Sequence, residues 1–83
     1  MKNEKCVALF KSIHEVLKVE EILQKEDIYC DIIPLPRNIS KSCGMGVVFI
    51  CNDLKKIKDK SAENNIEPQY FYRLQEGQFQ IMP

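Results

Sequence analysis

Two short stretches that are apolar at almost every position constrain the fold more than any other feature. They occupy residues 5–10 (Lys-Cys-Val-Ala-Leu-Phe) and 46–51 (Gly-Val-Val-Phe-Ile-Cys). Bounded apolar runs of this length are typical of strands that are covered on both faces, because successive side chains of a strand point to opposite faces of the sheet. The chain is therefore predicted to place these two strands in the centre of one sheet.

A helix is predicted directly after the first apolar run. Residues 12–15 (Ser-Ile-His-Glu) match a capping box, in which the Ser12 hydroxyl accepts from the Glu15 amide and the Glu15 carboxylate reaches back to the Ser12 amide. Apolar residues then recur at helical spacing, which indicates a helix over residues 12–26. A second strand is expected over residues 28–33, where β-branched and aromatic residues gather.

The second half of the chain is predicted to contain another helix and another strand. Asn52 or Asp53 can cap the helix that follows the second apolar run. Residues 69–74 alternate in the manner of a strand. Residues 75–83 have two interpretations: Gly77 turns the chain into a short extra strand, or the segment is a loose tail.

The order strand, helix, strand, strand, helix, strand predicts an α+β fold of the ferredoxin-like βαββαβ sandwich type. Its antiparallel sheet has the strand order 4-1-3-2 with two helices on one face, so the two apolar runs lie centrally. Residues 1–83 are expected to form a single domain. Because the central strands also need cover on the helix-free face, we expect a homodimer.

Composition excludes several classes of function. The 83 residues carry a formal net charge of zero, with no basic cluster interleaved with aromatic residues, so nucleic-acid binding is not expected. The longest apolar run is far shorter than the roughly 20 residues that span a bilayer, so no membrane insertion is expected. The opening residues lack the apolar core of a signal peptide, and we expect a cytoplasmic protein.

The cysteines indicate neither a disulfide scaffold nor a metal site. Cys6, Cys30 and Cys51 lie inside apolar runs, where cysteines of reduced cytosolic proteins are usually small buried hydrophobes. The chain has no Cys-x-x-Cys pair and one histidine, so no metal and no cofactor are predicted.

The fourth cysteine, Cys43, lies in a long loop and is the best candidate for a reactive atom. About twelve residues separate the second and third predicted strands, although antiparallel neighbours need only two to five, and loops of such length are usually functional or disordered. Arg37 and Lys41 are positive charges of the kind that lower the pKa of a nearby thiol and raise its thiolate fraction. Cys43 is therefore predicted to be the reactive thiol of the loop.

Other residues of the predicted site are small or polar. Gly44 and Gly46 are expected to adopt positive φ and to expose backbone amides, which form an anion-binding nest. His14 is a candidate base for the thiol if the two lie within hydrogen-bond reach. The predicted site consists of the thiol of Cys43 and the binding residues Arg37, Ser40, Lys41, Ser42, Gly44, Gly46 and His14.

Two alternatives to a reactive Cys43 remain open. In the first, the glycines only turn the chain into the third strand, Arg37 and Lys41 are solvated surface charges, and the thiol has no chemical role. In the second, Cys43 is part of a redox switch with Cys30 or Cys51, which requires a Cα separation under about 7 Å.

The motif Pro34-x-Pro36-Arg37-x-Ile39-Ser40-x-x-Cys43-Gly44 resembles that of a small bacterial family labelled selenium/sulfur carrier-like. Weaker support comes from Phe10, Ser12, His14 and Glu20-x-x-Leu23. The resemblance implies a protein encoded near genes of selenium or sulfur metabolism, with Cys43 as the carrier atom.

The function predicted from the motif and the resemblance is that of a sulfur or selenium carrier. Cys43 accepts the chalcogen as a persulfide or selenopersulfide from a donor protein and passes it to an acceptor protein, so the chain is a carrier and not an enzyme with a small substrate. The alternative is a noncatalytic homodimeric module that binds a small ligand or a protein.

Overall fold

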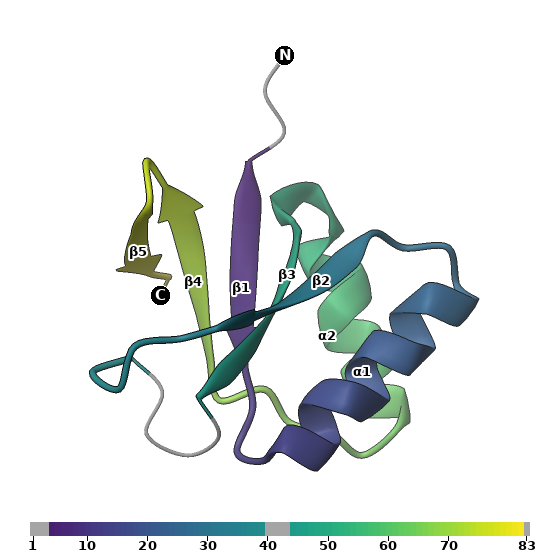
Figure 1. The fold of residues 1–83 in the computed structure, drawn as a ribbon. Helices are drawn as coiled ribbons and strands as arrows, with labels where there is room; N and C mark the ends of the chain where they lie inside the picture. The colour runs from purple at the N-terminus through teal and green to yellow at the C-terminus, as the bar shows by residue number, and fades with distance from the viewer. Residues whose placement is uncertain (1–3, 40–43, 83) are drawn as a thin grey trace.

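The structure is a computed structural model that describes residues 4–39 and 44–82. It contains one antiparallel five-stranded sheet and two α-helices (Figure 1), which confirms the predicted α+β class. The elements in chain order are β1 (Lys5–Leu9), α1 (Ile13–Lys25), β2 (Cys30–Pro34), β3 (Met45–Ile50), a 3₁₀ turn η1 (Cys51–Asp53), α2 (Leu54–Glu63), β4 (Tyr70–Gln75) and β5 (Gln78–Ile81).

The strand order is β2-β3-β1-β4-β5, which differs from the predicted four-stranded order because β5 extends the sheet beyond β4. A tight hairpin makes this extension possible: Glu76 and Gly77 both have positive φ, 50° and 76°, as a two-residue type I′ turn requires. Of the two interpretations of residues 75–83, the short extra strand is the one observed.

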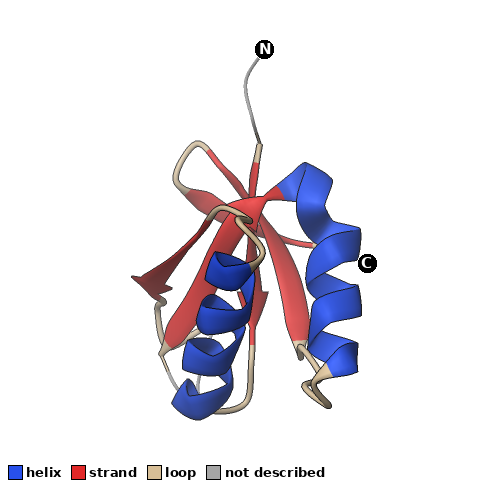
Figure 2. Cartoon of the chain, turned by 90° about the vertical axis from the view of Figure 1, so that its right-hand side faces the viewer, coloured by secondary structure: helices blue, strands red, loops and turns tan. Residues whose placement is uncertain are grey.

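Both helices lie against one side of the sheet. Figure 2 shows both of them in front of the strands. Helix α1 begins where the capping residue predicts, since the Ser12 hydroxyl accepts from the Glu15 amide at 3.4 Å. The reciprocal half of the capping box is not observed: Glu15 Oε1 is buried and has no hydrogen-bond partner among the described residues.

The main core lies between the helices and the sheet. Residues from β1 and β3 that point toward the helices are fully buried there, together with part of the apolar side chains of each helix. The cluster consists of Cys6, Ala8, Phe10, Val16, Val19, Leu23, Val47, Phe49, Ile57 and Ile66. This burial explains why both central strands carry no polar side chain on that face.

The helix-free side of the sheet is covered in part by the chain itself. Val7, Leu9 and Val48 are at most 4% exposed, because Leu35 from the segment after β2 packs on them. Partly buried Ile33, Ile39, Tyr72, Leu74 and Phe79 surround this second cluster. The predicted cover of the helix-free face is therefore supplied in part by the same chain, and the homodimer stays a prediction.

Gly46 permits the contact that attaches the segment after β2 to the sheet. An added Cβ at this position lies 2.7 Å from Leu35 Cδ1 and 2.7 Å from Val7 Cγ1, distances that real Cβ atoms do not tolerate. The absence of a side chain at Gly46 is therefore what allows Leu35 to lie directly on β3.

We predict that Gly46→Ala destabilises the fold by about 1–3 kcal/mol, because overpacking a filled site displaces its neighbours. Urea unfolding of the purified protein measures this change. In a Leu35→Ala background the same substitution is expected to cost less, since one of the two clashing side chains is gone. Equal costs in both backgrounds contradict the role assigned to Leu35.

Candidate functional site

The segment that joins β2 to β3 is held closed at its base by backbone hydrogen bonds. Pro34 pairs with Met45 at the end of the β2–β3 ladder, and the Leu35 amide donates to the Gly44 carbonyl at 2.8 Å. Residues 36–39 form a turn in which the Ile39 amide donates to the Pro36 carbonyl at 3.0 Å. Together with burial of the Leu35 side chain, these bonds hold the segments on either side of residues 40–43.

Four of the predicted site residues, Ser40, Lys41, Ser42 and the thiol-bearing Cys43, lie outside the described residues. Their assignment stays a prediction. The other four are placed by the structure at one end of the sheet or near it.

The two glycines of the predicted nest differ in conformation. Gly44 has φ +69°, in the left-handed region, and an added Cβ there meets no atom within 4 Å. Gly46 does not have positive φ and is buried inside β3 opposite Leu9. The expectation of positive φ at both glycines is therefore correct for Gly44 and wrong for Gly46, whose lack of a side chain serves packing.

Arg37 and His14 are both exposed to solvent. Arg37 lies in the turn that follows Pro36, and His14 is the second residue of α1. Because Leu9 at the end of β1 pairs with Gly46 near the start of β3, the start of α1 and the Gly44 end of the loop lie at the same end of the sheet (Figure 1). The topology thus places Gly44 and the start of α1, which contains His14, at the same end of the sheet, whereas Arg37 follows Leu35 on the helix-free side.

Cys30 is the free cysteine among the described residues, and its environment opposes ionisation. Partial burial raises the pKa of the Cys30 thiol, and the negative charges of Glu20 and Asp31 raise it further. The sulfur lies 3.9 Å from the Glu20 carbonyl oxygen, at the limit for a weak S–H donor. Cys30 is therefore a poor nucleophile at neutral pH.

Cys6 and Cys51 form a disulfide, which the sequence interpretation did not predict. Cys6 is fully buried, as expected, but the two cysteines are not the separate hydrophobes that the interpretation assumed. The signal was present in the predicted topology: in an antiparallel pair the start of one strand lies beside the end of the other, and Cys6 and Cys51 occupy those positions. The expectation of separate buried thiols came from the assumed reducing compartment and did not take this juxtaposition into account.

A redox switch between Cys43 and Cys51 is not compatible with this pairing while the disulfide is intact. Within residues 4–39 and 44–82, no group of three or more His, Cys, Asp or Glu side chains is arranged to hold a metal ion. In the same part of the chain, neither helix has the length and apolarity needed to cross a membrane.

The model of the family described as "Putative Se/S carrier protein-like" matches residues 5–73, which is 69 of the 83 residues. The chain belongs to this family. The match includes Cys43 and both cysteines of the disulfide. Neither a curated protein nor a solved structure matches the chain.

We predict that Cys30 reacts with iodoacetamide at pH 7 more slowly than a model thiol, because its raised pKa leaves less thiolate. The measurement uses the Cys43→Ser variant with the disulfide intact, followed by mass spectrometry. Glu20→Gln is expected to accelerate the reaction by removing a negative charge near the sulfur. Glu21→Gln is the control, since that carboxylate pairs with Lys25 at 3.2 Å; equal acceleration by both variants contradicts the prediction.

Proposed function

We propose that the protein is a sulfur or selenium carrier that holds the chalcogen on Cys43 as a persulfide or selenopersulfide. Membership in the carrier-like family, through a match that includes Cys43, is the observation that carries this proposal. The closed base of the loop supports it, because a loop attached at Leu35 and Gly44 can present one residue without unfolding the sheet.

The transfer step needs no oxidant. The Cys43 thiolate attacks the terminal sulfur of a donor persulfide, a new S–S bond forms on Cys43, and the donor leaves as a thiolate. Transfer to an acceptor repeats the same exchange with the acceptor thiolate as the nucleophile, and Cys43 is released as a thiolate. A selenopersulfide follows the same electron count with selenium as the transferred atom.

Arg37 and Lys41 are proposed to stabilise the anionic forms of Cys43. Positive charge beside a thiol favours the thiolate, which is the reacting species. Arg37 is exposed on the turn at the loop base and has no ion pair with a described carboxylate within 4.0 Å, so its charge is free to act on a neighbouring anion. Gly44, with its positive φ, allows the chain to turn directly after Cys43.

We predict that incubation with a cysteine desulfurase and cysteine adds sulfur to the wild-type protein and not to Cys43→Ser. Intact-protein mass spectrometry measures an increase of one sulfur, which dithiothreitol removes. Cys30→Ser is the matched control and is expected to accept sulfur as the wild type does, because the pKa of Cys30 is raised. No addition to the wild type, or equal addition to Cys43→Ser, refutes the carrier proposal; ligand binding without sulfur addition favours the noncatalytic module.

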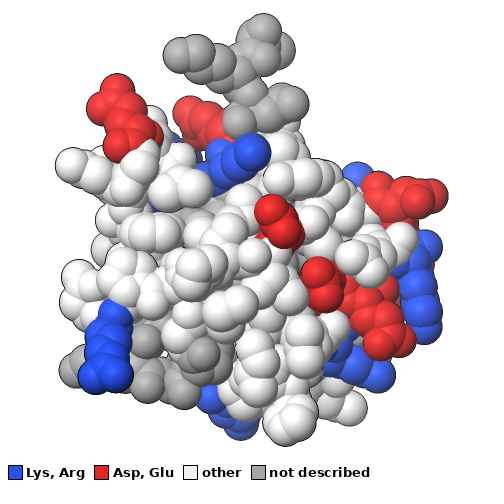
Figure 3. Space-filling view, viewed as in Figure 1, with Lys and Arg blue, Asp and Glu red and all other residues white. Residues whose placement is uncertain are grey.

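A homodimer is proposed as the assembly of the carrier, with Tyr70 and Ile81 at the contact. These two side chains are 54% and 60% exposed. The register places them on the same side of the sheet as Tyr72, the side without helices. Figure 3 shows few charged side chains across the middle and left of the molecule, where β2, β4 and β5 lie.

Sedimentation of the wild type is expected to give about twice the 9.7 kDa chain mass, and Tyr70→Lys is expected to give the monomer. Leu17→Lys is the matched control, because Leu17 is 50% exposed on α1, away from the proposed contact. A monomeric wild type, or dissociation by Leu17→Lys alone, contradicts this assembly.

A further inference from the structure

The disulfide lies at the end of the sheet opposite the loop that contains Cys43. It joins the second residue of β1 to the first residue of η1, with a Cα–Cα distance of 5.1 Å. The Cys51 amide also donates to the Glu4 carbonyl at 2.9 Å. Figure 1 shows that β3 separates this end of the sheet from the end where the loop begins.

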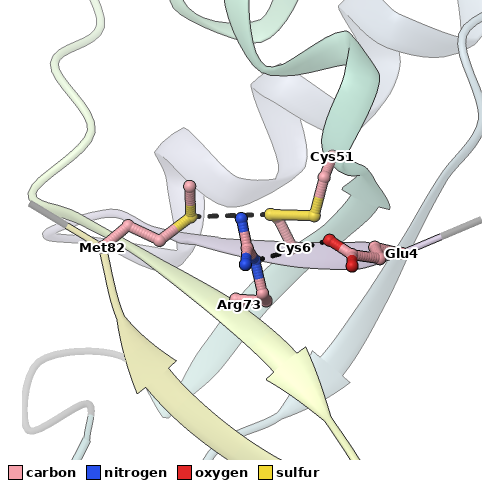
Figure 4. The surroundings of a disulfide bond; sticks show 5 residues. All are labelled: Glu4, Cys6, Cys51, Arg73 and Met82. Carbon is pink, nitrogen blue, oxygen red and sulfur yellow. Dashed lines mark hydrogen bonds and ion pairs between the residues drawn. A yellow bond between two sulfur atoms is a disulfide. The ribbon is translucent and has the colours of Figure 1, made fainter.

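The two cysteines of the disulfide differ in exposure. Cys6 is fully buried, whereas Cys51 keeps partial exposure. The Met82 sulfur lies 3.6 Å from Cys6 Sγ, and Figure 4 shows this contact. Since Cys6 carries no proton in the disulfide, this is a sulfur–sulfur contact and not a hydrogen bond. Met82 is therefore one of the groups that cover the buried Cys6 sulfur.

A positive charge lies beside the buried sulfur. Arg73 is the direct cross-strand partner of Cys6 in the β1–β4 pair, and directly opposite Cβ atoms are about 4.5–5.5 Å apart. Figure 4 shows the Arg73 side chain next to Cys6. Arg73 Nε lies 3.5 Å from Glu4 Oε2, an ion pair that lacks hydrogen-bond geometry. The Glu4 carboxylate thus competes with a Cys6 thiolate for the positive charge of Arg73.

We propose that Cys6–Cys51 is a thiol–disulfide exchange site at which a small thiol, such as a glutathione-type peptide, attacks Cys51 and releases Cys6 as a thiolate beside Arg73. In the first step the incoming thiolate forms an S–S bond to Cys51 as the Cys51–Cys6 bond breaks. A second thiol then attacks the sulfur of the bound thiol and releases Cys51. Two thiols are oxidised to one disulfide, and the protein is reduced by two electrons.

The direction of the exchange follows first from access, because Cys51 is partly exposed and Cys6 is fully buried. Burial alone opposes the thiolate of Cys6, and the cation of Arg73 offsets that cost when Cys6 leaves. Attack at the other sulfur requires access to the fully buried Cys6, which Met82 contacts, and releases the partly exposed Cys51 instead. This exchange uses neither Cys43 nor Cys30, so it is independent of the carrier function.

The test uses the Cys30→Ser/Cys43→Ser variant, in which Cys6 and Cys51 are the only cysteines. The oxidised protein is incubated with reduced glutathione, quenched with acid, and analysed by peptide mass mapping and by the rate of disulfide loss. We expect the glutathione adduct on Cys51. Added Arg73→Gln is expected to slow the loss on the order of three- to tenfold, and Arg73→Lys to retain most of the rate.

Two further variants separate charge from structure. Glu4→Gln is expected to accelerate the exchange, because it removes the carboxylate that pairs with Arg73. If the Glu4–Arg73 pair had only a structural role, Glu4→Gln and Arg73→Gln would change the rate in the same direction. Lys58→Gln is the matched control, since it removes a positive charge whose ammonium lies 5.4 Å from the Phe71 ring centroid. An adduct on Cys6, equal rates for Arg73→Gln and Lys58→Gln, or failure of the reduced protein to close the disulfide with oxidised glutathione overturns the proposal.

Discussion

The antiparallel pairing of β1 with β3 is the interaction on which the rest of the structure depends. The ladder runs from Lys5 opposite Ile50 to Leu9 opposite Gly46, and buried side chains point from it to both faces of the sheet. One face anchors the two helices, and the other anchors Leu35 and the segment after β2. A one-residue slip in this register exchanges the two faces, so the pairing determines the helix-side core and the attachment of the loop together.

The pairing also explains which parts of the structure the sequence could predict. Continuous apolarity over β1 and β3, the capping serine before α1 and the alternation in β4 are local signals, and each is found where it was expected. The hairpin at Gly77 is also local, since it pairs Gln75 with Gln78, although the two interpretations of residues 75–83 were left open. The packing of Leu35 on Gly46 and Val7 depends on contacts between residues farther apart in the chain. Composition and periodicity do not report contacts between distant residues, so the cover that Leu35 gives to the helix-free face was not predicted.

In the candidate site too, features that depend on neighbouring residues could be predicted from the sequence, and features that depend on distant residues could not. The motif around Cys43 was found from residue types, and the family match includes it. Prediction of the Cys6–Cys51 disulfide needs the register of two strands, because the cysteines are 45 residues apart in sequence. Prediction of the neighbours Arg73 and Met82 also needs the positions of β4 and β5. An assumption about the redox compartment was used in place of that geometry, and it led to the wrong covalent state.

The strand that joins the two thiol sites also keeps them apart. Six residues of β3 separate Gly44 from Cys51, which at about 3.3 Å per residue corresponds to roughly 20 Å. A chalcogen held next to Gly44 therefore cannot pass directly to Cys51 of the same chain while β3 remains paired on both sides. Because the disulfide ties the start of β1 to the end of β3, its reduction loosens the end of the sheet that lies away from the carrier loop. Exchange at Cys51 is thus expected to change the stability of the chain without occupying Cys43, the thiol that we propose as the carrier.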